Sequence, residues 1–518
     1  MKFTILRTKS DLEHWSNQGQ GQELHFVPTM GCLHQGHKEL IKAAKNFSGE
    51  QPSKVLVSIF VNPLQFGEGE DFIKYPRNLE KDCQTALEAG ANAIWAPSLE
   101  TIFPNGRENY FTIQAPYALK QSLCGANRRN HFDGVATIVL RLLNLVHPSH
   151  LFLGEKDWQQ LVIIKQLIQE LGLKVEVKSI ATVRDKDGLA YSSRNEYLTI
   201  EERAKVLTLS KLLLQESIQF QSDKTINLNK LRSALENNGL RVEYLETVDY
   251  KSLAPVNYYE SKLCLLAAAV HCGKTRLIDH IFLMNRKPII AIDGPAGAGK
   301  STVTKRFAKQ LGLIYLDTGA MYRAVTWFLQ EQKIDADNEK ELIKALTNLK
   351  IDINLKDSGT QQVLLNGKDI SKEIRSPIVT QEVSRIASKA TVRHKLTAQQ
   401  KLIGLKGGIV AEGRDIGSTV FPDAEIKIFL TASSKERAKR RANDLANQGF
   451  RVPNLKELES QIQERDKMDS AREIAPLKKA KDAIEIVTDG MTIEEVIETL
   501  TKIFREEIPE EVWPSNQM

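Results

Sequence analysis

The stretch best suited to chemistry is residues 289–302, IIAIDGPAGAGKST, which fits the pattern G-x-x-x-x-G-K-[ST] behind an apolar run. Its glycines let backbone N–H groups turn toward an anion at the positive end of a helix dipole. Lys300 would reach the β- and γ-phosphates of a nucleotide, and the Ser301 hydroxyl would bind Mg²⁺. An ordinary glycine-rich turn is the alternative, but the expected flanking strand and helix favour a phosphate-binding loop. ATP would be bound here by Gly294, Gly297, Gly299, Lys300, Ser301 and Thr302, with Lys300 catalytic.

A second glycine turn carries two histidines. An expected strand at 24–27 ends in PTMG at 28–31, and His34 and His37 lead into a helical run at 38–46. A strand, a turn and a helix N-terminus again suit a phosphate. The H-x-x-H pair alone is a weak signal, because two structural histidines fit it equally well. Zinc is disfavoured, since no neighbouring Cys/His cluster completes a tetrahedral site.

Polar residues follow two further expected strands. Asn62 and Gln65 come after the apolar run at 54–61, and Lys156, Asp157 and Gln160 come after the one at 151–154. In an open α/β sheet the carboxyl ends of the strands form the edge where ligands bind. Two alternatives stay open: Asn62 caps a turn before Pro63, and the charged residues are a solvated helix cap.

Four stretches together resemble the pantothenate synthetase (pantoate-beta-alanine ligase) family over about residues 1–280. They are PTMG with the two histidines, IFVNPLQF at 59–66, GEKD at 154–157 with Gln160, and GLAYSSRN at 188–195. The resemblance implies ATP-dependent joining of pantoate to β-alanine through a pantoyl adenylate. The histidines would stabilise the triphosphate, and the Ser-Ser-Arg loop would close over it. Tyr191 stands where many relatives carry methionine.

That resemblance also implies residue roles. His34, His37 and Lys156 would be catalytic, with His37 a proton donor, and Asp157 would hold Mg²⁺ or ATP. The ATP-binding residues would be Met30, His34, His37, Gly154, Glu155, Lys156, Asp157, Val183, Tyr191, Ser192, Ser193 and Arg194, and pantoate and β-alanine would be bound by Asn62, Gln65 and Gln160.

The C-terminal half places arginines after further expected strands and on expected helices. DTGAMYR at 317–323, EGRD at 412–415, FPDA at 421–424, and Arg465-Asp with Asp469 and REIAPL at 472–477 resemble bacterial cytidylate kinase over about residues 289–508. Guanidinium groups suit phosphate oxygens, as a kinase with a phosphorylated acceptor requires. The resemblance implies that CMP or dCMP is bound by Thr318, Arg323, Arg393, Arg414, Asp415, Asp469 and Arg472, and that Arg437 and Arg441 of a lid at about 437–455 close over ATP.

Composition limits the class of protein. The 518 residues are 42% hydrophobic and 26% charged, with a net charge of +6, which lacks the polybasic excess of a nucleic-acid binder. No apolar run is long enough for a membrane span, and no signal-peptide core follows Met1, so a cytoplasmic protein is expected. The five cysteines include no C-x-x-C pair and are expected to be reduced.

The sequence therefore predicts a natural fusion of two α/β enzymes. A Rossmann-like nucleotidylyl transferase domain at 1–195 with a lid domain at 196–281 would precede a linker at 282–288. A P-loop nucleoside monophosphate kinase domain at 289–518 would follow, with an insert at about 346–390. Mg²⁺ with ATP is expected and no tightly bound organic cofactor; the partners would be small-molecule substrates, without nucleic acid or membrane.

Three questions stay open at this stage. Members of the ligase family often dimerise through the N-terminal domain, so a homodimer is compatible with the sequence. One half could be a silent scaffold or nucleotide sensor, although Lys300, Asp469, His37 and Lys156 are all present. An RNA-binding aminoacyl-tRNA synthetase relative would also carry an H-x-x-H motif, but the balanced charge disfavours it.

Overall fold

The computed structural model describes residues 4–18, 21–47, 52–67, 70, 72–106, 108–256, 263–355, 361–447 and 452–513. The chain forms two compact units. The first contains Met1–Asn285 and, from the far end of the chain, Pro509–Trp513; the second runs from Arg286 to Ile508. No helix among the described residues has the length and apolar character needed to cross a membrane.

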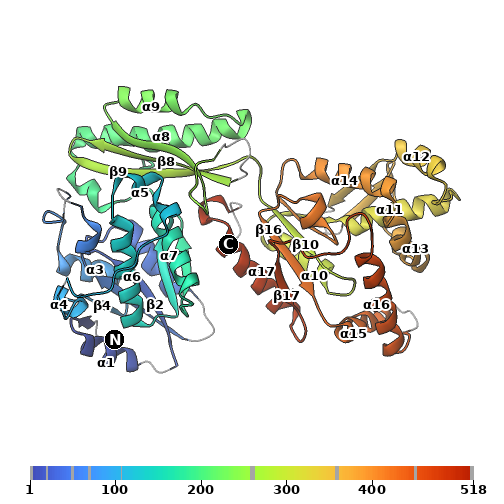
Figure 1. Ribbon diagram of the computed structural model, residues 1–518, viewed down its shortest axis with the longest axis horizontal. Helices are drawn as coiled ribbons and strands as arrows, with labels where there is room; N and C mark the ends of the chain where they lie inside the picture. Colours follow the sequence, from blue (N-terminus) through green and yellow to red (C-terminus); the bar gives the residue numbers. More distant parts are fainter. Residues whose placement is uncertain are drawn as a thin grey trace. The chain divides into compact units, whose positions relative to one another are not determined.

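A six-stranded parallel sheet forms the body of the first unit (Figure 1). Its order, β1-β4-β3-β2-β5-β6, reverses its direction of growth between β2 and β5. At such a switch point the carboxyl ends of the strands leave a crevice for ligands. The strands are β1 Thr4–Leu6, β2 Glu23–Thr29, β3 Ser53–Ile59, β4 Ala93–Trp95, β5 His150–Gly154 and β6 Glu176–Ile180.

Alternate residues of the central strands enter two different cores. On β2, Phe26 packs with residues of α6 and α7, whereas Val27 packs with residues of α2 and α3. Leu56 and Val57 of β3 divide in the same way, as the two-residue period of a strand covered on both faces requires. The helices are α1 Lys9–Asn17, α2 Gln35–Asn46, α3 Leu79–Ala89, α4 Leu99–Ile102, α5 Leu123–Asn127, α6 His131–Val146 and α7 Trp158–Glu170.

A three-stranded antiparallel sheet with two helices completes the first unit. Its strands, in order, are β7 Arg241–Asp249, β8 Leu263–Cys272 and β9 Thr275–Met284. The helices are α8 Ile200–Asp223, which begins with a capping box of Thr199 and Glu202, and α9 Leu228–Asn237. Because Met284 still pairs with Leu263, residues 282–284, expected in the linker, are strand residues.

The second unit is built on a five-stranded parallel sheet in the order β11-β15-β10-β16-β17. Its central strand β10 leads directly into the glycine-rich loop and α10. The strands are β10 Ile289–Asp293, β11 Ile314–Asp317, β15 Ile409–Gly413, β16 Ile426–Thr431 and β17 Ile484–Val487. The helices outside the expected insert are α10 Lys300–Gln310, α11 Thr318–Glu331, α14 Ala390–Gly404, α15 Ser434–Asn447, α16 Leu455–Ser470 and α17 Ile493–Glu507.

The insert expected at 346–390 contains a small antiparallel sheet, β12-β13-β14. Its elements, with the helix before it, are α12 Glu339–Thr347, β12 Ile351–Leu355, β13 Gln361–Leu365, β14 Lys368–Asp369 and α13 Pro377–Ala387. The lid expected at 437–455 covers most of α15 and the start of α16, and its residues 448–451 lie outside the described part of the chain.

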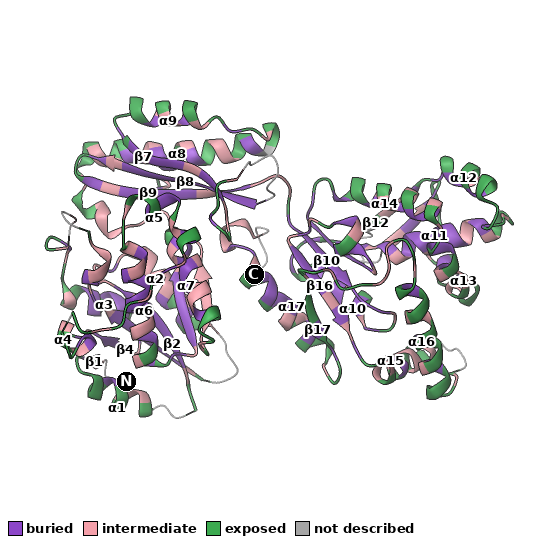
Figure 2. Ribbon diagram, viewed as in Figure 1, coloured by how far each residue is buried: buried purple, intermediate pink, exposed green. Residues whose placement is uncertain are grey.

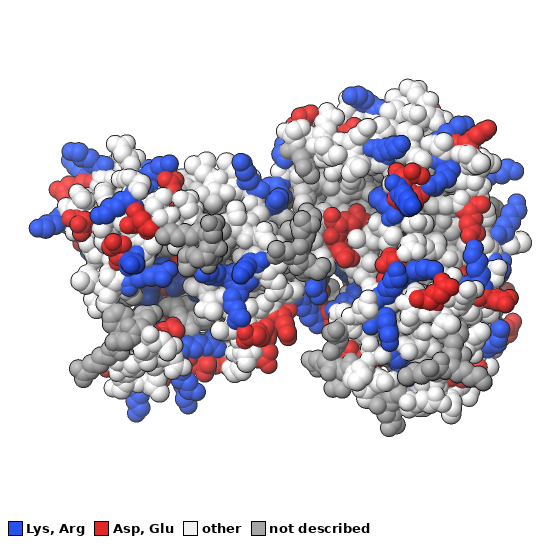
Figure 3. Space-filling model, turned by 180° about the vertical axis from the view of Figure 1, so that it is seen from behind, with Lys and Arg blue, Asp and Glu red and all other residues white. Residues whose placement is uncertain are grey.

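Burial and charge follow the layered architecture. Figure 2 shows the strands of both parallel sheets largely buried and the outer faces of the helices exposed. Figure 3 shows acidic and basic side chains interspersed over the face in view, with basic side chains concentrated across the middle of the second unit. Interspersed signs are typical of a soluble enzyme rather than of a broad polyanion-binding surface.

Gly134 marks the closest approach between α6 and the short helix η1, Pro63–Gln65. A Cβ atom at Gly134 would lie 2.2 Å from the Leu64 carbonyl oxygen, so one element would have to move. We expect Gly134→Ala to lower the free energy of unfolding of the first unit by about 1–3 kcal/mol in urea denaturation, as overpacked sites do.

Gly67→Ala is the matched control, because a Cβ there would meet only the Glu70 side chain, at 3.8 Å. Equal stability of the two variants would show that η1 can yield without cost.

Candidate functional site

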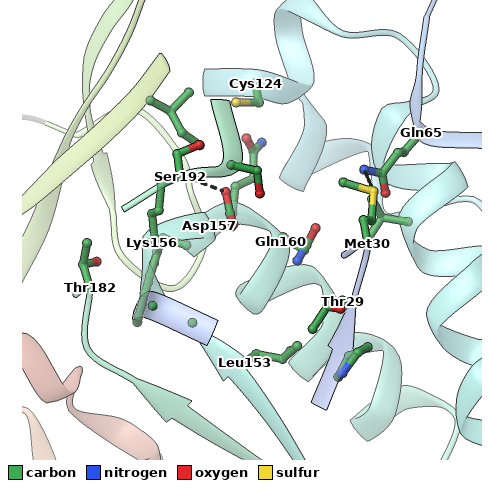
Figure 4. A pocket seen from close by; sticks show the side chains of 18 of the residues that line it. Thr29, Met30, Gln65, Cys124, Leu153, Lys156, Asp157, Gln160, Thr182 and Ser192 are labelled. Carbon is green, nitrogen blue, oxygen red and sulfur yellow. Dashed lines mark hydrogen bonds and ion pairs between the residues drawn. The ribbon is translucent and has the colours of Figure 1, made fainter. Parts of the chain in front are cut away.

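A cavity of about 310 Å³ lies at the carboxyl edge of the six-stranded sheet (Figure 4). Every residue that the sequence predicts for the ligase site lines it, except Glu155. Lys156 and Ser192 lie on one side in Figure 4, and Met30 and Gln65 lie on the opposite side. Strand ends and the loop at 181–194 thus bring together residues that are up to 164 positions apart, from Met30 to Arg194.

The rings of the two histidines lie close together, at a tilt of 38°, at the start of α2. His34 is the N-cap residue, its Nδ1 accepts the Gly36 N–H at 3.2 Å, and its ring centroid lies 4.1 Å from that of His37. Burial is the main cause that lowers the pKa of His34 to about 2 and that of His37 to about 4; the charge of Lys156 contributes to both values, and Asp157 opposes it at His37. Both rings are therefore neutral at neutral pH, with α2 aimed at the cavity, and an incoming polyanion would favour their protonation.

The side chains of the GEKD stretch point either into the cavity or into the protein interior. Lys156 and Asp157 line the cavity, with Nζ and Oδ1 3.7 Å apart. Burial alone would raise the pKa of Asp157, but Lys156 and Arg194 outweigh it and keep the carboxylate ionised. Glu155, expected among the ATP-binding residues, is fully buried, and its carboxylate accepts backbone N–H groups of the C-terminal segment instead.

Gln65 is held at the far end of the cavity. Its Nε2 donates to the Met30 sulfur at 3.0 Å, and its Oε1 accepts from Asn62 Nδ2 at 3.2 Å. Asn62 also caps η1, because its Oδ1 accepts the Leu64 N–H at 3.0 Å. The capping role left open from the sequence is therefore present, while Asn62 still lines the cavity.

In the second unit, Lys300 folds over its own glycine-rich loop. Its Nζ donates to the carbonyl oxygens of Gly294 and Pro295, both at 2.7 Å. Burial, reinforced by the nearby Arg414, lowers the pKa of Lys300. Nucleotide phosphates would relieve this crowding of cations and give Lys300 a stronger acceptor.

Residues predicted to bind CMP form linked ion pairs. Asp469 accepts from Arg414 Nε at 3.1 Å and from Arg472, and the buried Arg393 donates to Asp415 at 2.5 Å. Burial is the largest cause that lowers the pKa of Arg472, and repulsion from Arg393 and Arg414 lowers it too. The acidic neighbours of Arg472 oppose this shift only in part. Guanidinium groups gathered in this way are suited to bind an anion.

The two other parts of the predicted kinase site also have defined partners. Arg323 donates to Asp317 at 2.7 Å, and Thr318 donates to the Glu412 carbonyl oxygen at 2.7 Å. Arg437 pairs with Asp466 at 2.6 Å and donates to the carbonyl oxygen of Ala296 in the glycine-rich loop at 3.2 Å. Arg441 lies near enough to Arg465 for its positive charge to help lower the pKa of that group.

A magnesium ion fits the donor atoms beside the glycine-rich loop. The Ser301 hydroxyl donates to Glu412 Oε1 at 2.6 Å, while Glu412 Oε2 is buried and has no hydrogen-bond partner among the described residues. A hydroxyl and a buried carboxylate oxygen are hard ligands of the kind Mg²⁺ prefers. Ser301 and Glu412 would hold the ion, and its chemistry would be charge neutralisation on the phosphates.

Sequence reasoning missed several residues of both sites. Glu412 and Arg465 belong to motifs of the kinase half, but nothing in the local sequence predicts that they are buried beside the phosphate loop. Arg128 and His131 were also missed: Arg128 Nη2 lies 3.2 Å and His131 Nδ1 2.8 Å from the backbone oxygen of Gln65. The one local feature that could have pointed to them is their closeness in sequence to Asn130, which has a positive φ of 61°.

One other group within the described residues has metal-ligand character. Glu23, His25 and His150 offer atoms within 4.8 Å of one another. His25 Nδ1 already lies 2.6 Å from the Ala44 carbonyl oxygen. Since Glu23 and His150 begin β2 and β5, the group lies at the opposite edge of the sheet from the cavity and outside the site.

Comparisons with known proteins divide the chain between residues 282 and 290, where the structure also passes from the first unit to the second. The family model described as "Pantoate-beta-alanine ligase" matches residues 4–282, and the one described as "Cytidylate kinase" matches residues 290–506. Two relatives from Prochlorococcus marinus strains, each described as "Bifunctional pantoate ligase/cytidylate kinase", are 65% identical over 517 residues and 58% identical over 502 residues. The first alignment covers 100% of both chains, and the second covers 97% of this chain and 99% of the relative. A solved pantothenate synthetase from Thermus thermophilus is 37% identical, covers 54% of this chain and 98% of that one, and has a TM-score of 0.48.

The lowered histidine pKa values make the stability of the first unit depend on pH. Below the ordinary pKa of 6.5 the unfolded chain binds protons that buried His34 and His37 do not, so stability falls as pH decreases from about 6.5 toward about 4. We expect His37→Gln to remove part of this loss, about 1–2 kcal/mol at pH 5 in urea denaturation. His14→Gln, at an exposed position on α1, is the control, and an identical pH profile for the two variants would contradict the buried neutral state.

Proposed function

Because the chain belongs to the pantoate-beta-alanine ligase family over residues 4–282 and to the cytidylate kinase family over residues 290–506, we propose that it catalyses two ATP-dependent reactions. One joins pantoate to β-alanine and releases AMP and diphosphate; the other phosphorylates CMP or dCMP and releases ADP. The observation that carries the proposal is that charged groups suited to adenylate formation line the cavity of the first unit, and charged groups suited to phosphoryl transfer lie around the glycine-rich loop of the second. The substrates are small molecules, a cytoplasmic location suits them, and dimerisation through the N-terminal half stays a prediction.

In the ligase reaction, a pantoate carboxylate oxygen attacks the α-phosphorus of ATP, and diphosphate leaves. Lys156, Arg194 and the N-terminus of α2 are positioned to neutralise the phosphates, and His37 to donate a proton or hydrogen bond as charge develops. Gln65 and Gln160 would orient pantoate. The amine of β-alanine then attacks the acyl carbon, and AMP leaves. Binding inside the cavity would limit the access of water to the hydrolysable acyl adenylate.

In the kinase reaction, a phosphate oxygen of CMP attacks the γ-phosphorus in line, and ADP leaves. Arg414 and Arg472 would hold the acceptor phosphate, with Asp469 fixing both guanidinium groups. Lys300 would move from its own loop carbonyls to the transferring phosphoryl group. Positioning and charge neutralisation supply most of the acceleration in such transfers. Mg²⁺ bound with ATP would add further neutralisation at Ser301 and Glu412.

The first test measures ATP consumption by the full chain with pantoate plus β-alanine and, separately, with CMP. We expect AMP from the first mixture and ADP from the second. Lys300→Met should lower CMP phosphorylation by about 10²–10³-fold, as loss of a charge-stabilising group does, and leave the ligase reaction unchanged.

Lys156→Ala should have the reverse effect, lowering only AMP formation by a similar factor. Lys309→Ala and Lys186→Ala are the matched controls, because both lysines are exposed, one on α10 and one in the loop at 181–194. Failure of one unaltered half to turn over, while folded, would identify that half as a sensor or scaffold.

A further inference from the structure

The last described residues, Pro509–Trp513, belong to the first unit, although the chain before them forms the second. They make a single short turn, η7 Glu510–Val512. This segment lies outside both regions matched by the family models, 4–282 and 290–506. The segment is therefore not part of the sequence that defines either family, and its contacts need a separate explanation.

The segment and the ligase unit exchange hydrogen bonds in both directions. Glu155 accepts the backbone N–H groups of Glu510 at 2.8 Å and of Glu511 at 3.3 Å. In return, Glu510 Oε2 accepts the Ala181 N–H at 2.7 Å, and Glu511 Oε1 accepts the Thr182 N–H at 3.1 Å. Since β6 ends at Ile180, these two amides have no strand partner on the sheet ladder, and two carboxylates satisfy them with charge-assisted bonds.

The contact is buried rather than superficial. Glu155 is 0% exposed, and His280 of β9 is 3% exposed. The His280 Nε2 has no hydrogen-bond partner among the described residues, and Glu511 Oε1 lies 3.6 Å from it. Val512 packs against the apolar core of the unit. Without the segment, Glu155 would lose two donors in a buried place, which is costly.

The backbone that the segment contacts, at Glu155 and at residues 181–182, leads directly into the ligase site. Glu155 immediately precedes Lys156, and Thr182 immediately precedes Val183, whose carbonyl oxygen accepts the Tyr191 N–H at 3.0 Å. Ala181, Thr182 and His280 line the cavity, and Figure 4 shows Thr182 and Lys156 on the same side of it. The segment thus holds the ends of β5 and β6 that form one wall of the expected ATP site.

We propose that Pro509–Trp513 is a brace for the ATP-binding wall of the ligase site, with Glu510 and Glu511 as positioning residues. They touch no substrate and act through the backbone that carries Lys156 and Val183. The inference rests on the proposed ligase function. It makes the ligase active site depend on residues 509–513, which follow the region matched by the kinase family model.

The test uses the full chain carrying Glu510→Ala and Glu511→Ala together. We expect the ligase KM for ATP to rise about tenfold, as the loss of two charge-assisted hydrogen bonds predicts, with the pantoate KM and CMP phosphorylation within about twofold. Glu510→Gln keeps an oxygen acceptor for Ala181 and should retain most of the affinity for ATP. Glu498→Ala, at an exposed position on α17, is the matched control.

Hydrogen exchange gives a second readout that needs no catalysis. Peptides covering residues 178–186 should exchange faster in the double variant than in the control. An unchanged or lower KM for ATP, or equal losses for ATP and pantoate, would overturn the brace. If the unaltered chain formed no AMP, the proposed function would fail, and unchanged exchange at 178–186 would then separately overturn the brace.

Discussion

Both units depend on buried carboxylates that each accept two consecutive backbone N–H groups. Asp82 accepts those of residues 32–33 at 3.0 and 2.7 Å, and Asp293 accepts those of residues 416–417, both at 2.7 Å. Glu155 does the same for the C-terminal segment. Loops at the carboxyl edge of a parallel sheet leave the ladder, so their amides need such partners. Burial raises the pKa of all three acids, to about 6 for Asp293 and about 7 for Glu155.

Burial lowers the pKa of both kinds of basic group around the sites, but only the histidines lose their charge at neutral pH. It makes histidines neutral, because an imidazole can release its proton, so His34 and His37 carry no charge before a ligand arrives. Guanidinium groups keep theirs, and burial with repulsion from Arg414 lowers the pKa of Arg465 only to about 10. The two histidines of the ligase cavity thus add no positive charge before ATP enters, whereas the buried arginines of the kinase site stay charged and favour anions.

The sequence predicted those parts of the sites that have a local signature. The glycine-rich loop, the histidine turn and the polar strand ends at Gln65 and Lys156 follow from short patterns on a parallel sheet, and the fold class is confirmed. The roles of Glu155 and Glu412 could not be predicted, since each depends on partners more than 90 residues away in the chain. The start of the linker was placed too early because β9 continues along β8, and such pairing has no signal at Phe282 itself.

The position of Pro509–Trp513 has a consequence for synthesis of the protein. A chain emerging from a ribosome completes the six-stranded sheet once residue 180 is out, but Glu155 and the amides of residues 181–182 find their partners only after Glu510 and Glu511 have been made. On the brace proposal, a chain that ended anywhere between residues 286 and 508 would carry an unbraced ligase site. Fusion already makes equal numbers of the two enzyme units. The brace would also keep the numbers of active units equal, because premature termination would impair both.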